Sequence, residues 1–199
     1  MKKIIFALTC ILVFALAASA QAQVGFGIKG GLTLAKLTGD NTGNLESRTG
    51  FMVGGYAGFP IGEGMTLQPE LVYAQKGAKF GTDSDDVVEK FDYVEIPVLF
   101  KYTVDGQGAR PYFLVGPYLG LNTSAKIESG GQSVDVDEIK STDFGLVFGL
   151  GVELQQFLIE ARYELGLTDI YEEPEGIEDL GSLKTSTIAF QIGYAFPTP

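Results

Sequence analysis

Apolar side chains recur at every second position in eight separate segments of this 199-residue chain. In the last segment, for example, Ile188, Phe190 and Ile192 share one face, and Gln191 and Gly193 share the other. A period of two is typical of a β-strand whose two faces meet different surroundings. The segments cover residues 26–34, 51–59, 67–76, 94–102, 110–121, 143–154, 159–167 and 188–196. An even number of strands of this kind predicts a closed antiparallel barrel.

The connections between the segments indicate which face of the barrel contacts lipid. Tight turns at 60–64, 104–108 and 155–156 alternate with longer, polar and mostly acidic connections at 38–48, 80–91, 123–141 and 169–184. Transmembrane barrels have short periplasmic turns and longer outer loops, and from a periplasmic N-terminus every long connection here falls on the outer side. Beyond the N-terminus no apolar stretch is long enough for a membrane helix, so any span consists of strands. The chain is therefore predicted to be all-β, an eight-stranded antiparallel up-and-down transmembrane β-barrel.

The face opposite the apolar one carries five basic and five acidic side chains, which balance. An eight-stranded barrel has an interior only just wide enough for side chains to fill, and glycines on this face make room for the larger ones. Buried charges must pair to offset their desolvation. We therefore predict a structural charge network in the lumen and no open pore. Its members are Lys29, Glu70, Lys76, Glu95, Lys101, Arg110, Glu153, Glu160, Arg162 and Glu164.

The N-terminus has the features of an export signal. Lys2 and Lys3 precede an apolar run over residues 4–17, and small residues follow, offering cleavage after Ala20 or Ala22. The run is short for a membrane-spanning helix, which needs about 20 residues. We predict that residues 1–22 are a cleaved signal peptide and that residues 23–199 form the barrel, in the outer membrane of a double-membraned bacterium.

Composition argues against several classes of function. Without Lys2 and Lys3 the chain has 12 basic and 25 acidic residues, a net charge of −13, which disfavours nucleic acid as a partner. Histidine is absent, so Ser-His-Asp and Cys-His catalytic arrangements and the usual zinc sites cannot be assembled. The acidic clusters at 83–86 and 135–138 lack the spacing of a calcium-binding loop. We expect a protein that is not an enzyme and has no cofactor or metal.

Five stretches carry a family resemblance. They are Phe26-Gly-Ile-Lys-Gly-Gly-Leu, Gly50-Phe-Met-Val-Gly-Gly, Leu67-Gln-Pro-Glu-Leu-Val-Tyr, Tyr93-Val-Glu-Ile-Pro-Val-Leu-Phe-Lys-Tyr and Arg110-Pro-Tyr-Phe-Leu-Val-Gly-Pro-Tyr. The chain resembles the outer-membrane β-barrel domain family often labelled "porin family" or PorT-like, and the resemblance implies an eight-stranded barrel of OmpA/OmpX-like architecture. Such barrels usually finish on an aromatic residue read by the insertion machinery, whereas Phe196 is followed here by Pro197-Thr198-Pro199. We expect Phe196 to serve as that insertion signal.

Within this class we favour a non-enzymatic barrel with an envelope-structural or surface-interaction role. Its expected partners are outer-membrane lipid and the barrel-insertion machinery, and the acidic outer loops leave a protein partner open. One alternative is a small-solute diffusion channel, which needs a wider barrel or unpaired lumenal charge. A second is a soluble lipocalin-like barrel, which would enclose its apolar rows around a ligand. An accessory role in protein secretion also stays open.

Overall fold

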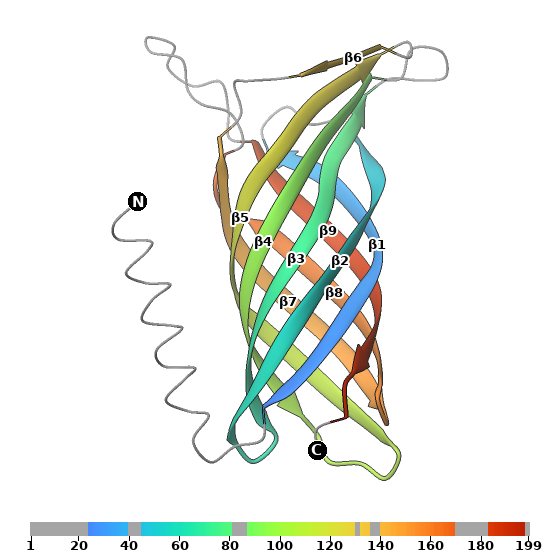
Figure 1. Ribbon diagram of the computed structural model, residues 1–199. Coiled ribbons are helices and arrows are strands. Elements are labelled where there is room, and N and C mark those ends of the chain that lie inside the picture. The colour runs from blue at the N-terminus through green and yellow to red at the C-terminus, as the bar shows by residue number, and fades with distance from the viewer. Residues whose placement is uncertain are drawn as a thin grey trace.

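The computed structural model describes residues 24–39, 45–80, 87–129, 132–135, 140–169 and 183–197. These residues form strands and the turns between them (Figure 1). None of the described residues belongs to a helix long and apolar enough to cross a membrane. The predicted signal peptide, residues 1–22, lies outside the described residues, so its cleavage stays a prediction.

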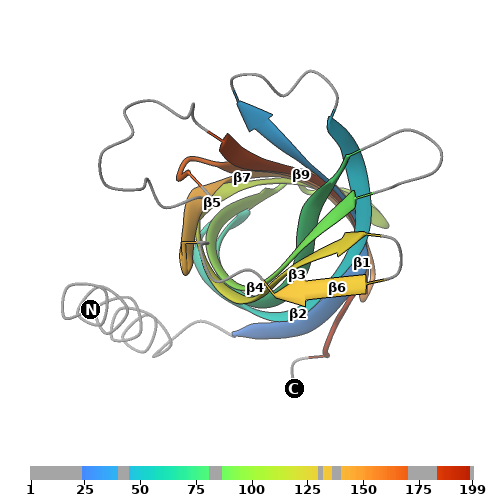
Figure 2. The same ribbon diagram turned by 90° about the horizontal axis from the view of Figure 1, so that it is seen from above.

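Eight strands form one closed wall. The described strands are β1 (Gly25–Gly39), β2 (Leu45–Gly62), β3 (Met65–Phe80), β4 (Val87–Thr103), β5 (Ala109–Ser129), β6 (Gln132–Asp135), β7 (Thr142–Leu154), β8 (Phe157–Gly166) and β9 (Leu183–Ala195). Around the wall their order is β4-β3-β2-β1-β9-β8-β7-β5, and an antiparallel pairing of β4 with β5 closes it (Figures 1 and 2). The short strand β6 pairs with β5 beyond the wall. The predicted eight-stranded up-and-down barrel is confirmed.

The outer connections are shorter than the sequence pattern predicted. Phe80 at the end of β3 still pairs with Val87 at the start of β4, and β5 runs on to Ser129, so the described strands cover much of the predicted loops at 80–91 and 123–141. β1 and β2 likewise extend into the predicted loop at 38–48. The reason is that alternation of apolar residues marks only the part of a strand that faces lipid. Above that level the backbone ladder continues although the outward side chains become polar.

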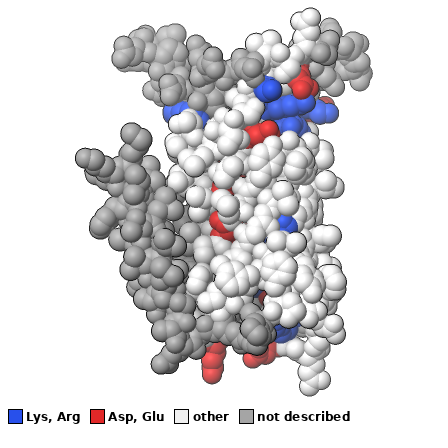
Figure 3. All heavy atoms as spheres, in the orientation of Figure 1, with Lys and Arg blue, Asp and Glu red and all other residues white. Residues whose placement is uncertain are grey.

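The apolar rows face outward, as predicted. Ile192 and Leu32 leave 72% and 62% of their surface exposed, while Val147 and Lys76 are completely buried on the inward face. Large apolar side chains exposed over a continuous wall are the mark of a surface covered by lipid. A lipocalin-like barrel would enclose these rows, so the soluble alternative is wrong. Figure 3 shows the consequence on one face of the molecule, where charged atoms are sparse over the middle of the wall.

Candidate functional site

The lumen holds an ion-pair layer in which positive and negative charges balance. Arg162 on β8 donates to both carboxylate oxygens of Glu70 on β3. Its Nη1 and Nη2 each lie 3.1 Å from Oε2, and Nη2 lies 3.3 Å from Oε1. Its Nε also donates to Oε1 of Glu160 at 2.8 Å. Lys29 on β1 completes the layer, with its Nζ 2.7 Å from Glu70 Oε1 and 3.2 Å from Glu160 Oε2. We name these four residues the lower layer; two cations neutralise two carboxylates there.

Neutral side chains satisfy the remaining oxygens of the lower layer. Gln68 donates to Glu70 Oε1 at 2.8 Å, and the Tyr112 hydroxyl donates to Glu160 Oε2 at 3.0 Å. Gln191 reaches Glu160 Oε1 at 3.4 Å. Buried carboxylates are tolerated when each oxygen has donors as well as an opposite charge. The lower layer meets both conditions and is a structural element rather than an unpaired acid–base pair.

A second layer lies nearer the outer end, and its charges do not balance. Lys76 on β3 has its Nζ 2.6 Å from Glu95 Oε1, 3.3 Å from Glu164 Oε2 and 3.7 Å from Asp143 Oδ2. We name these four residues the upper layer. Asp143 is well satisfied, because the hydroxyls of Tyr118, Thr168 and Thr185 also donate to it. Within the described part of the chain, neither oxygen of Glu164 accepts a hydrogen bond. One lysine therefore serves three carboxylates.

The periplasmic rim holds the last predicted members of the network. Glu153 on β7 pairs with Lys101 and, at 2.6 Å from its Oε2, with Nη2 of Arg110. Lys101 is buried, whereas half of the Arg110 side chain is exposed. Arg110 therefore differs from the sequence prediction: it lies at the edge of the barrel rather than in the lumen, because it is the second residue of β5.

The structure thus brings the ten predicted residues into three groups rather than one balanced network. One further acidic side chain belongs to the lumen. Asp143 lies buried in the inward row of β7, as its alternation with Phe144 indicates, but it is not among the ten predicted residues. Counting it turns the balance of the lumen negative.

Each of the three lumenal lysines has its ammonium group over the face of a tyrosine ring. The Nζ of Lys76 lies 4.4 Å from the ring centre of Tyr118, and that of Lys101 lies 4.2 Å from the ring centre of Tyr112. Lys29 stands farther from Tyr56, at 5.6 Å. A cation over an aromatic face is stabilised by the ring quadrupole, more strongly where water is excluded. The tyrosines therefore replace part of the hydration that the lysines lose.

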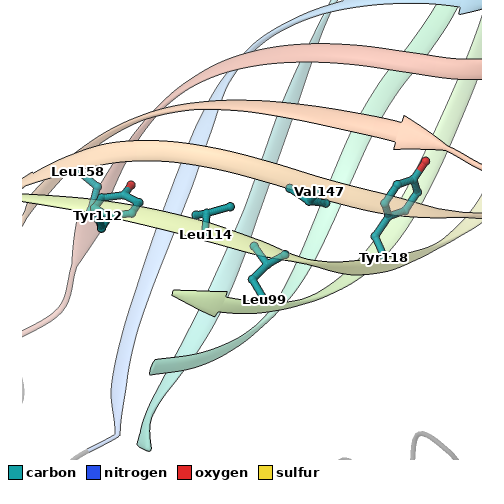
Figure 4. Packing of buried hydrophobic residues seen from close by; sticks show 6 residues of the cluster. All are labelled: Leu99, Tyr112, Leu114, Tyr118, Val147 and Leu158. Carbon is teal, nitrogen blue, oxygen red and sulfur yellow. The ribbon is translucent and has the colours of Figure 1, made fainter. Parts of the chain in front are cut away.

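Glycines opposite these tyrosines provide the space for their rings. In the register of β5 with β7, Tyr112 pairs with Gly151 and Tyr118 pairs with Gly145. Figure 4 shows Tyr112 and Tyr118 at the two ends of a buried row on β5, with Leu114 between them and Leu99 and Val147 nearby. A Cβ at Gly145 would overlap the Tyr118 ring and the backbone oxygen of Leu165. The tyrosines and leucines fill the volume that the glycines leave.

Replacing Gly145 with alanine is therefore expected to destabilise the barrel. Overpacking of a tight interior costs about 1–3 kcal/mol. The free energy of unfolding, measured by urea titration of the protein in phosphatidylcholine vesicles, should fall by that amount. Gly25→Ala is the matched control, because a Cβ at Gly25 meets nothing within 4 Å. Equal effects of the two substitutions would contradict the packing argument.

An apolar cluster of buried residues lies in the outer part of the barrel. Leu37, Ala78, Phe91, Tyr93 and Ala125 pack together and are all buried. Phe91 lies four residues outward of Glu95 along β4, so the cluster covers the upper layer. The burial of Phe91 is not predicted by the sequence pattern, which places residues 80–91 in a loop. Its signal was the continued alternation of Phe91 and Tyr93 with Lys90 and Asp92.

Phe196 lies just beyond β9, which ends at Ala195. Its backbone N–H donates to the carbonyl oxygen of Phe26 at 2.8 Å, so it continues the pairing with β1. The ring is exposed and lies 5.9 Å from that of Tyr194, centre to centre. Its role as an insertion signal stays a prediction.

Among the described residues, no group of three or more His, Cys, Asp or Glu side chains has the arrangement to hold a metal ion. The described lumenal carboxylates are each close to a lysine or an arginine. A closed wall with lipid-facing apolar rows around an ionic centre defines a small transmembrane β-barrel of the outer-membrane type.

The comparison with family models agrees with this class. The model for "Outer membrane protein beta-barrel domain" matches residues 19–172, and the chain belongs to that family. The resemblance drawn from the five sequence stretches is thereby confirmed, and the protein is an outer-membrane barrel.

Solved structures with a similar fold include several small outer-membrane proteins. Ail of Yersinia pestis is 20% identical over 87% of this chain and 99% of its own, with a TM-score of 0.47. Neisserial surface protein A is 19% identical over 86% and 97%, with a TM-score of 0.49. OprG of Pseudomonas aeruginosa is 14% identical over 88% and 97%, with a TM-score of 0.48. A search of the curated proteins finds no match.

Proposed function

We propose that this protein is a non-enzymatic, non-conducting outer-membrane barrel that acts through its outer end, in envelope structure or in contacts at the cell surface. The observation that carries the proposal is the burial of the two ionic layers. The side chains of Arg162 and Lys76, one in each layer, have no exposed surface at all. A water-filled path through the lumen would have to wet the charged groups that line it.

The charged side chains of the lumen also form ion pairs with one another. A porin lumen is polar and filled with water, so its charged groups meet solute. Here Arg162 is held by Glu70 and Glu160, and Lys76 is held by Glu95. The apolar cluster around Phe91 adds a dry layer above them. These features support a filled lumen rather than the small-solute channel.

The outer end is where a surface role would lie. Strands β3, β4 and β5 continue above the apolar rows, and residues 169–182 carry six acidic side chains and no basic one. Such a segment favours a partner with a basic surface, because opposite charges steer association. The absence of histidine from the sequence supports a non-enzymatic role.

Planar-bilayer recording tests the filled lumen. We expect no stable conductance steps of the size given by a general porin inserted in the same bilayer as a positive control. Folding of the sample is checked by the difference in gel migration between boiled and unboiled protein. Large, steady steps from folded protein would replace this proposal with the channel function.

A further inference from the structure

Three prolines lie inside strands of the barrel wall rather than in its turns. They are Pro69 on β3, Pro97 on β4 and Pro117 on β5, and these three strands are neighbours in the wall (Figure 1). Proline has no backbone N–H, so it removes a hydrogen bond from the ladder and is normally confined to edge strands and bulges. Because the wall is closed, none of these strands is an edge of it. Each proline therefore costs the wall one hydrogen bond.

The strand register is interrupted once at each of these prolines. Two consecutive residue pairs are missing there, while the register itself does not shift at these three places. The bordering pairs are Tyr56–Glu70 and Phe59–Leu67 around Pro69, Pro69–Val98 and Val72–Glu95 around Pro97, and Pro97–Tyr118 and Phe100–Val115 around Pro117. The described pairing of β1 with β2, β1 with β9, β5 with β7, β7 with β8 and β8 with β9 has no such break. The wall thus has an interrupted sector, β2 to β5, and a continuous sector, β7 to β1 through β8 and β9.

The three missing hydrogen bonds belong to a single row that crosses four strands. Successive residues of a strand in a sheet bond alternately to the two neighbouring strands. The facing pairs, in which each second pair begins one residue after the previous proline, are Ala57–Pro69, Glu70–Pro97 and Val98–Pro117. The carbonyl oxygens opposite the prolines therefore lack the N–H group that a regular ladder supplies, and within a membrane such a loss is costly. We name the three prolines the proline row.

The lower layer connects the proline row to the continuous sector across the lumen. Glu70 directly follows Pro69, and its carboxylate is held by Arg162 on β8 and by Lys29 on β1. The side chains of Arg162 and Glu70 have no exposed surface, so water does not weaken this ion pair. Nearer the outer end, Lys76 on β3 contacts Glu164 on β8 in the same way. Ion pairs thus join the part of the wall with the interrupted ladder to the part where the ladder is complete.

We propose that the proline row is a seam along which the wall opens locally, and that the ion pairs of the lower layer hold this seam closed. Segments with fewer stabilising contacts open at a lower free energy than the whole protein unfolds. Strands β3, β4 and β5 also continue above the apolar rows. Opening at the seam would therefore let the outer ends of these strands move relative to the continuous sector. Such movement does not require a conducting lumen.

Hydrogen–deuterium exchange of the mature protein, folded in phosphatidylcholine vesicles, tests the seam without any substitution. The backbone amides of residues 67–76 and 93–100, beside the proline row, are compared with those of residues 158–165 and 186–193 in β8 and β9. The two sets lie at a similar depth, because Arg162 contacts Glu70 across the lumen. We expect exchange beside the row to be at least about fivefold faster, the effect of one net hydrogen bond. Equal protection of the two sets would overturn the seam.

Replacing two of the prolines with alanine tests the cause of the opening. Pro97→Ala combined with Pro117→Ala supplies the missing N–H groups opposite Glu70 and Val98. Exchange beside the row should slow by about fivefold for each restored hydrogen bond. Pro60→Ala is the matched control, because it removes a proline from β2 at the periplasmic end, outside the row, and should leave this exchange unchanged. Exchange that does not slow in the folded double variant would show that the prolines are not its cause.

Arg162→Met tests whether the lower layer holds the seam closed. Although this substitution is on β8, exchange should rise more beside the proline row than in β8 and β9. Adding Pro97→Ala and Pro117→Ala to Arg162→Met should reduce that rise, because the restored hydrogen bonds replace part of what the ion pairs supplied. An equal rise in both sets of amides would mean that the lower layer stabilises the barrel as a whole, and its specific role at the seam would be wrong.

Discussion

Replacing Arg162 with methionine is expected to lower the free energy of unfolding by about 3–5 kcal/mol, the cost of removing one partner from a buried ion pair. Arg162 is the centre of the lower layer: it holds Glu70 through two nitrogens and Glu160 through Nε and Nη2. Without it, Lys29 is the one cation among the described residues that still pairs with these two buried carboxylates. The measurement is a reversible urea titration of the folded protein in phosphatidylcholine vesicles.

The same position offers two controls for this loss. Arg162→Lys keeps the positive charge but removes the planar guanidinium group. It should therefore lower the free energy of unfolding by less than Arg162→Met does. Combining Arg162→Met with Glu70→Gln and Glu160→Gln removes the unpaired charges, and much of the lost stability should return. A loss below about 1 kcal/mol for Arg162→Met would place the guanidinium in water. The buried lower layer would then be wrong.

The sequence was sufficient to predict most of the side chains that face inward, with Arg110 the exception at the rim. A strand reverses its side chains at every residue, so the position of Glu160, Arg162 and Glu164 in one row follows from their spacing alone. Their partners could not be predicted in this way. Lys29 and Glu160 are separated by 131 positions in sequence and Arg162 and Glu70 by 92. Their contact depends on how the barrel closes and on the stagger of its strands, which the local pattern does not contain.

The outer third of the barrel was the part that the sequence predicted least well. Alternation of apolar residues reports contact with lipid, and it fades where the strands leave the membrane. For this reason the sequence pattern predicts a loop at Phe91, although this residue lies in the apolar cluster above the upper layer. Glycines such as Gly145 were expected to make room for larger side chains. The register of β5 with β7 is needed to show that the Tyr118 ring occupies the space beside Gly145.

The charge imbalance of the upper layer leads to the second large effect. Lys76→Met should lower the free energy of unfolding by about 3–5 kcal/mol, because it leaves Glu95, Asp143 and Glu164 buried without the ammonium group that contacts all three. The nearest guanidinium contact of this layer is long, 3.8 Å from Arg162 Nη1 to Glu164 Oε1. The same urea titration measures the loss.

The carboxylates of the upper layer should respond differently from those of the lower layer. Because Glu164 accepts no hydrogen bond among the described residues and shares Lys76 with two other carboxylates, Glu164→Gln removes repulsion along with attraction. Its effect on stability should be under about 1 kcal/mol, and Lys76→Met combined with Glu95→Gln and Glu164→Gln should recover much of the loss. Glu160→Gln is the matched comparison in the lower layer, where the carboxylate is bound by Lys29, Arg162 and Tyr112, and it should cost more. Equal costs for Glu164→Gln and Glu160→Gln would show that the two layers are electrostatically alike, and the surplus of negative charge beneath Phe91 would have to be abandoned.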